Sequence, residues 1–77
     1  MAAITPIQSK MARAALGWGV RTLAARAGVS VPTVVRFESG AVKSTRGTLA
    51  LLQKAFEAEG VQFLNDEAPG IRIMRKP

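Results

Sequence analysis

The chain has 77 residues, and its 11 lysines and arginines against five acids give a formal net charge of +6. It contains neither cysteine nor histidine, which excludes a disulfide framework and, in effect, a structural zinc site. A chain of this length forms one domain near the lower size limit for independent folding, so dimerisation would supplement its stability.

The positive charge is concentrated in the first 54 residues. Eight lysines or arginines stand there against one acid, Glu38, a net of +7, whereas residues 55–77 carry three basic and four acidic side chains, a net of −1. A basic lobe attracts polyanions, although the same charge also serves simply to keep a small protein soluble. Because neither a signal-peptide pattern nor a bilayer-spanning apolar run is present, we expect a cytoplasmic protein without membrane contact.

The first predicted helix covers residues 6–16. Thr5, Pro6 and Gln8 form a capping box with proline at the first helical position. The apolar side chains of this helix form a stripe that we expect to face the core: Ile7, Met11, Ala14 or Ala15, and Leu16. This arrangement leaves Ser9 outside the buried face.

Two short helices are predicted next, over residues 20–27 and 30–38. Gly28 can take the left-handed conformation that ends the first, and Ser30 is a good N-cap for the second. The β-branched run Val29–Val35 would also suit a strand. Pro32 would remove a ladder donor from such a strand, so the residues alone favour the helix without excluding the strand.

The segment LAARAGVSVPTVVRFESG, residues 23–40, resembles the helix-turn-helix of the lambda repressor and Cro family, also called the xenobiotic-response-element family. That family's pattern has an L-A-x-x-A-G-V-S core followed by T-V/I-x-x-x-E-x-G, and both halves are present at the right spacing. The resemblance covers roughly residues 8–58. It implies a mainly α fold, a four-to-five-helix lambda-repressor-like domain over residues 1–60 that binds double-stranded DNA. The resemblance also implies a nucleoid-associated protein of bacterial or phage type.

The resemblance places helix 30–38 in the major groove with its N-terminal residues at base edges. It implies that four residues read bases: Val31, Pro32, Thr33 and Arg36. Arg36 can donate two hydrogen bonds to guanine, whereas Val31 and Pro32 offer only apolar surface, suited to thymine methyl groups. The alternatives are that Arg36 contacts phosphate without reading sequence and that Pro32 merely begins the helix.

Other family positions imply contacts with the DNA backbone. Lys43 and Arg46 match loop positions that meet phosphates, and Ser39 and Ser44 could add hydrogen bonds. Arg21, on the helix before, is a further phosphate candidate. These contacts would raise affinity without adding sequence preference.

Arg13 occupies the family position of an arginine that pairs with the glutamate of the E-x-G motif, which is Glu38 here. The resemblance therefore implies a buried structural ion pair between them. Gly19 and Val20 depart from the family pattern, which often has a Ser or Thr N-cap followed by a phosphate-binding Gln. Trp18, in the preceding turn, is expected to fill the core between the first two helices.

A fourth helix is predicted over residues 45–59, capped by Ser44 or Thr45 and ended by Gly60. Residues 61–77 differ in character, because the runs VQFLN and GIRIM alternate partially and a turn-rich DEAPG separates them. They predict a C-terminal β-hairpin, with Val61 and Phe63 on one face and Ile71 and Ile73 on another. The apolar side chains must either pack on the helices or, through edge pairing with another chain, help to form a dimer. In the second case these four residues are the dimerisation candidates.

Together these features predict a dimeric transcriptional repressor acting on an inverted-repeat operator. Two alternatives use the same fold: a protein-binding antitoxin or anti-regulator, and a DNA-bending accessory factor in excision or integration. Enzymatic activity is not expected, because the chain has no His, Cys or Tyr and its five carboxylates show no paired spacing. We expect no cofactor and no metal.

Overall fold

The computed structural model describes residues 4–40, 44–65 and 69–74 of the chain. This part of the chain forms four helices and then a two-stranded antiparallel sheet: α1 Pro6–Leu16, α2 Val20–Ala27, α3 Val31–Ser39, α4 Arg46–Glu57, β1 Val61–Asn65 and β2 Pro69–Ile73. The predicted mainly α fold with a C-terminal hairpin is confirmed, and each helix end lies within two residues of the prediction.

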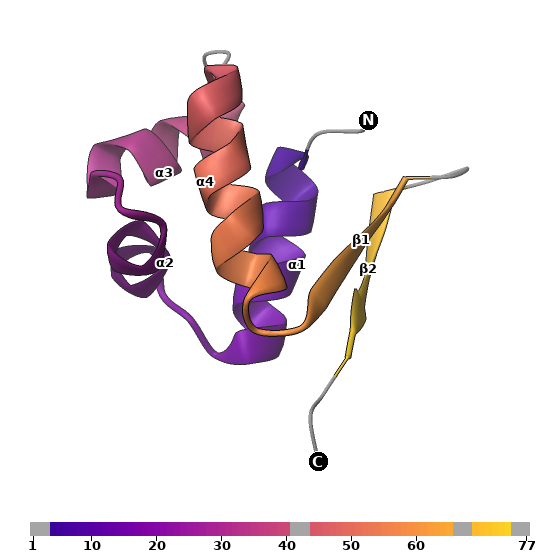
Figure 1. Ribbon diagram of the computed structural model, residues 1–77. Coiled ribbons are helices and arrows are strands. Elements are labelled where there is room, and N and C mark those ends of the chain that lie inside the picture. The colour runs from indigo at the N-terminus through magenta and orange to yellow at the C-terminus, as the bar shows by residue number, and fades with distance from the viewer. Residues whose placement is uncertain (1–3, 41–43, 66–68, 75–77) are drawn as a thin grey trace.

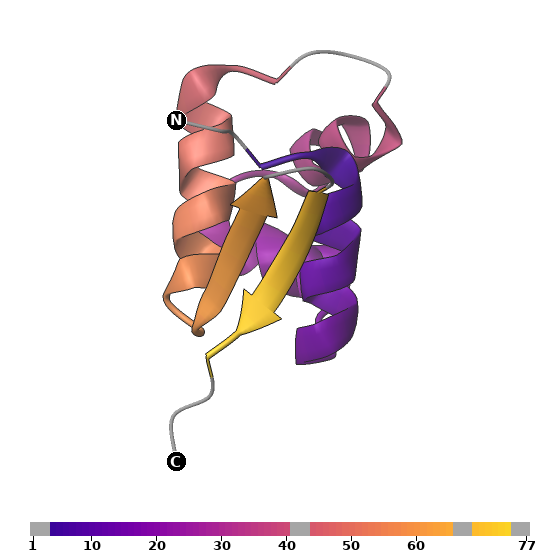
Figure 2. The ribbon, with the colours of Figure 1, turned by 90° about the vertical axis from the view of Figure 1, so that its right-hand side faces the viewer.

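The hairpin and the α2–α3 pair lie on opposite sides of the molecule. In Figure 1 α2 and α3 stand at the left and the strands at the right, with α1 and α4 between them. Figure 2 shows the hairpin lying across α4 and α1, and the closest packing of the strands is β1 against α4 and β2 against α1. The surface of α3 that faces away from the core is therefore remote from the hairpin.

Local capping explains where the helices begin and end. The Thr5 hydroxyl accepts a hydrogen bond from the Gln8 amide at 3.2 Å while Oε1 of Gln8 accepts one from the Thr5 amide at 3.0 Å, which completes the predicted capping box. Thr45, not Ser44, caps α4, because its Oγ1 accepts from the Thr48 amide at 3.2 Å. Gly28 ends α2 in the left-handed region, with φ of 73°.

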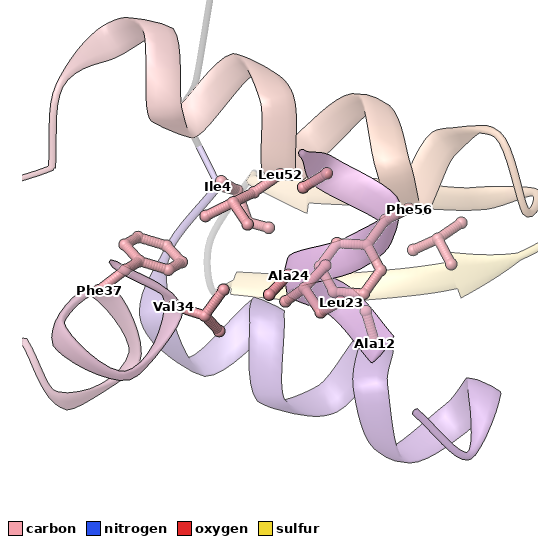
Figure 3. Close-up of a cluster of buried hydrophobic side chains, with 10 residues drawn as sticks. Ile4, Ala12, Leu23, Ala24, Val34, Phe37, Leu52 and Phe56 are labelled. Carbon is pink, nitrogen blue, oxygen red and sulfur yellow. The ribbon is translucent and has the colours of Figure 1, made fainter. Parts of the chain in front are cut away.

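Side chains from all four helices and from β1, together with Ile4 before α1, form one hydrophobic core. Figure 3 shows most of them: Ile4, Ala12, Leu23, Ala24, Val34, Phe37, Leu52 and Phe56. Phe56 is fully buried, stacks on Trp18 at 5.6 Å between ring centroids, and meets Phe63 edge-on at 5.9 Å. Trp18 thus packs into the core as expected, and its aromatic partner belongs to α4.

The predicted inward face of α1 is wrong at several positions. Ile7 is exposed, and so are both Ala14 and Ala15, one of which was predicted to face inward. The fully buried residues are instead Gln8, Ser9 and Ala12. Burial of Gln8 and Ser9 is possible because each finds hydrogen-bond partners in distant parts of the chain.

Gln8 joins α1 to the hairpin. Its Nε2 donates to the carbonyl oxygens of Leu64 at 3.1 Å and Gly70 at 3.0 Å, two residues directly opposite each other in the sheet. The same side chain caps α1 through its oxygen. One buried amide therefore fixes both the start of α1 and the position of the two strands.

The apolar side chains of the hairpin share one face, which corrects the predicted division between two faces. Val61 lies opposite Ile73 and Phe63 opposite Ile71, and directly opposed residues project to the same side of a sheet. Val61 is buried and the other three are half-buried against the core. Of the two roles predicted for these side chains, the structure thus has them packing on the protein's own helices.

Candidate nucleic-acid interface

α2 and α3 form a compact pair joined by Gly28, Val29 and Ser30. Leu23 and Ala24 of α2 and Val34 of α3 are buried in the common core. Val34, Phe37 and Glu38 make up the inward side of α3, so its opposite side faces outward. The Ser30 hydroxyl caps α3 by accepting from the Thr33 amide at 3.3 Å.

Glu38 ties the C-terminal part of α3 to α1. Its Oε2 accepts from Ser9 Oγ at 2.6 Å and from Arg13 Nε at 2.8 Å, and its Oε1 accepts from Arg13 NH2 at 2.6 Å. Arg13 also donates to the carbonyl oxygen of Trp18 at 3.2 Å. Arg13 and Glu38 therefore form an ion pair within a network that spans α1, α3 and the turn after α1.

The charge state of this network follows from its contacts. Burial raises the pKa of Glu38, but the hydrogen bonds from Arg13 and Ser9, together with the positive charges of Arg13 and Lys10, outweigh it and leave the pKa below its ordinary value. The hydrogen bond to Glu38 raises the pKa of Arg13. Both groups are ionised at neutral pH, and Arg13 is engaged within the fold.

The outward side of α3 is mainly apolar. Val31 is 37% exposed and Val35 is 51% exposed, one helical turn apart, and Pro32 and Arg36 are exposed one turn apart beside them. Thr33 is half-buried, and its hydroxyl lies 2.7 Å from that of Ser30. The four base-reading candidates therefore lie on one short helix, and three of them are exposed.

The outward side of α3 also includes the exposed Val35, which was not among the sequence-based candidates for base reading. Its spacing of four from Val31 was the available signal, because residues at that spacing share one side of a helix.

The phosphate candidates are distributed between α2 and the segment that joins α3 to α4. Arg21 is exposed on α2, and Arg46 is exposed at the first position of α4. Ser39 ends α3 and donates to the Arg36 carbonyl at 2.9 Å, and Ser44 is half-buried. Lys43 lies outside the described residues.

Arg26, a basic residue of α2, makes its contacts within the protein. Its guanidinium carbon lies 5.2 Å from the centre of the Trp18 ring, and its NH1 lies 3.5 Å from the Glu59 carboxylate. This stacking and pairing hold Arg26 over the core beside α4.

Two classes of site find no support among the residues that the structure describes. No group of three acidic, histidine or cysteine side chains is placed to hold a metal ion. None of the helices in residues 4–40 and 44–65 has the length and apolar character to cross a membrane.

A family model described as helix-turn-helix matches residues 10–62. The match contains the whole of α2, α3 and α4 together with most of α1. No curated protein is similar enough to the chain to match it.

Proposed function

Because the chain belongs to the helix-turn-helix family of lambda repressor and Cro type, whose members bind DNA, we propose that it is a sequence-specific transcriptional repressor of double-stranded DNA operators. One observation carries the proposal. Glu38, the only acid among residues 1–54, is buried and paired, whereas Lys10, Arg21, Arg36 and Arg46 are exposed. The described surface of this lobe therefore presents positive charge alone, which favours contact with phosphates.

Within that function, Arg36 is the proposed base reader. It is exposed in α3, and its guanidinium suits the O6 and N7 atoms of guanine. Thr33 is a secondary candidate, because its hydroxyl already contacts Ser30. The contacts with the DNA backbone are proposed for five other residues: Lys43, Arg46, Ser39, Ser44 and Arg21.

We further propose that the repressor acts as a homodimer on an inverted repeat, with half-sites about one helical turn of DNA apart. The inward face of the hairpin packs on α1 and α4, so a dimer contact there would use the strand edges rather than the side chains of Val61, Phe63, Ile71 and Ile73.

The test begins with selection of bound duplexes from a random pool, followed by titration of wild type and variants. Arg36→Ala should relax the preference at one base pair per half-site, by about 1–3 kcal/mol. Arg46→Ala should weaken binding to every duplex and lower the salt slope by about one. Arg72→Ala is the matched control, since Arg72 is exposed on the hairpin, remote from α3. Absence of duplex binding at low salt refutes the proposal.

Two other functions would use the same surface. The exposed Val31, Pro32 and Val35 could contact a protein partner, as in an antitoxin or anti-regulator. Co-purification of a stoichiometric partner that abolishes DNA binding would favour that function. Multiple spaced sites in recombination regions would favour a DNA-bending accessory factor.

A further inference from the structure

We propose that α3 recognises the 5-methyl group of thymine in its operator through an apolar patch of Val31, Pro32 and Val35. The proposal rests on the DNA-binding function above and specifies what the reading helix recognises. It adds Val35 to the recognition surface and assigns thymine discrimination to methyl contacts, beside Arg36 as the guanine reader.

The exposure of this patch is the first observation. The exposed large hydrophobic residues in the described parts of the chain are Ile7, Val31, Val35, Leu51 and Met74. Two of these five lie on the nine-residue α3, and exposed Pro32 lies between them. The side of α3 that would enter the groove therefore carries exposed apolar surface, which DNA binding would remove from water.

The second observation is that hydroxyls near this patch are engaged by the helix itself. Oγ of Ser30 accepts from the Thr33 amide and lies 2.7 Å from the Thr33 hydroxyl. Pro32 has no N–H to donate. Among the exposed residues from Val31 to Arg36, Arg36 is thus the one with a long hydrogen-bonding side chain. The other exposed side chains in this stretch offer apolar contacts.

The major groove offers one apolar feature that distinguishes bases, the C5-methyl group of thymine. A valine in a helix is nearly fixed in one χ1 rotamer, so it loses little side-chain freedom on contact. Burial of one methyl-sized group is worth about 0.8 kcal/mol, a factor of about four in affinity. The apolar patch would therefore distinguish thymine from cytosine. It would also distinguish 5-methylcytosine from cytosine, because the methyl group is the feature recognised.

The experiment uses the full chain and a selected operator in which each thymine is replaced in turn by deoxyuridine, which removes only the methyl group. We expect a loss of about fourfold at each contacted thymine and no change at the others. At a contacted position, cytosine should bind more weakly than 5-methylcytosine, again by about fourfold. Both comparisons change a methyl group and leave the neighbouring hydrogen-bonding pattern of each pair intact.

Variants connect the methyl effect to particular side chains. Val35→Ser and Val31→Ser should each abolish the uracil penalty at one position per half-site. Serine and valine have similar helix propensities and both residues are exposed, so these variants should fold, which thermal unfolding would check. Leu51→Ser is the matched control, because Leu51 is 43% exposed on α4. It should leave every uracil penalty unchanged.

The outcomes separate this inference from the function on which it rests. Sequence-selective binding that tolerates uracil at every position overturns methyl recognition and leaves the DNA-binding regulator intact. Binding without sequence preference also overturns the inference, and absence of duplex binding removes the proposed function itself. If the two serine variants keep the wild-type uracil penalties but lose a stoichiometric protein partner, the patch is a protein-binding surface and the inference is wrong.

Discussion

Replacing Arg13 by alanine should destabilise the fold more than any other single arginine substitution in the described chain. Glu38 is 6% exposed and would lose the hydrogen bonds that Arg13 donates at 2.8 and 2.6 Å, keeping only the one from Ser9. Stranding one member of a buried pair costs about 3–5 kcal/mol. A domain of this size has a total stability of only about 4–12 kcal/mol, so a large fraction would be lost.

The pH dependence of stability is a second, independent test of the Arg13–Glu38 pair. In the wild type the folded pKa of Glu38 lies below the unfolded value, so its stabilising contribution is fully present above the unfolded value and is lost as pH falls through the folded pKa. In the variant the hydrogen bonds and the charge of Arg13 are absent, so we expect burial, the largest cause in the wild type, to raise the pKa of Glu38. The folded state then binds more protons than the unfolded state, and stability contributed by this group rises as pH falls.

Urea unfolding at neutral pH and near pH 4, followed by the fluorescence of Trp18 and by circular dichroism, measures both effects. Trp18 is the only tryptophan, and its stacking on Phe56 makes its emission sensitive to loss of the core. Arg21→Ala is the matched control, since Arg21 is exposed and its loss should cost less than about 0.5 kcal/mol. Equal destabilisation by the two substitutions, or a gap between wild type and Arg13→Ala that does not narrow in acid, would refute the reasoning.

Three further predictions concern the hairpin, its connection to the helices, and α4. Gln8→Ala should lower the free energy of unfolding by about 1–3 kcal/mol and accelerate hydrogen exchange in the hairpin more than in α3, because Gln8 donates to two strand carbonyls. The control Gln53→Ala, on α4, should change neither the free energy of unfolding nor the exchange rate of the hairpin. Gly60→Ala should destabilise by more than about 1 kcal/mol, because φ is 85° and an added Cβ would overlap the Met74 carbonyl oxygen. Gly47→Ala, whose Cβ would meet only the Thr45 hydroxyl at 3.9 Å, should instead stabilise by up to about 1 kcal/mol in thermal unfolding.

The helices could be predicted from sequence because the signals that bound them are local. Thr5 with Gln8, Ser30 with Thr33, and Gly28 each act within a few residues of a helix end. The β-branched run of α3 was ambiguous from propensity alone, and the family resemblance decided it. Within the fold, the burial of Val34 and Phe37 gives the run the packed side that a short helix needs.

The inward side of α1 and the face of the hairpin could not be predicted because they depend on partners far away in sequence. Hydrophobic periodicity placed Ile7 inward, whereas the polar Gln8 and Ser9 are buried through hydrogen bonds to residues more than 25 positions away. The common face of the hairpin follows from its register, which sets Phe63 opposite Ile71 and which no local signal determined. The assignments of base and phosphate contacts depend on a bound duplex and stay predictions.

The proposed insertion of α3 into the major groove requires that the helix be held at a fixed angle. Apolar contacts to methyl groups have little directionality, so the valines cannot by themselves set the angle at which α3 enters a groove. Hydrogen bonds to the Glu38 carboxylate, by contrast, are short and directional, and they fix the C-terminal part of α3 against α1. The Ser30 cap fixes the other end. Orientation therefore comes from the buried polar network, which leaves the outward side chains of α3 free to be apolar.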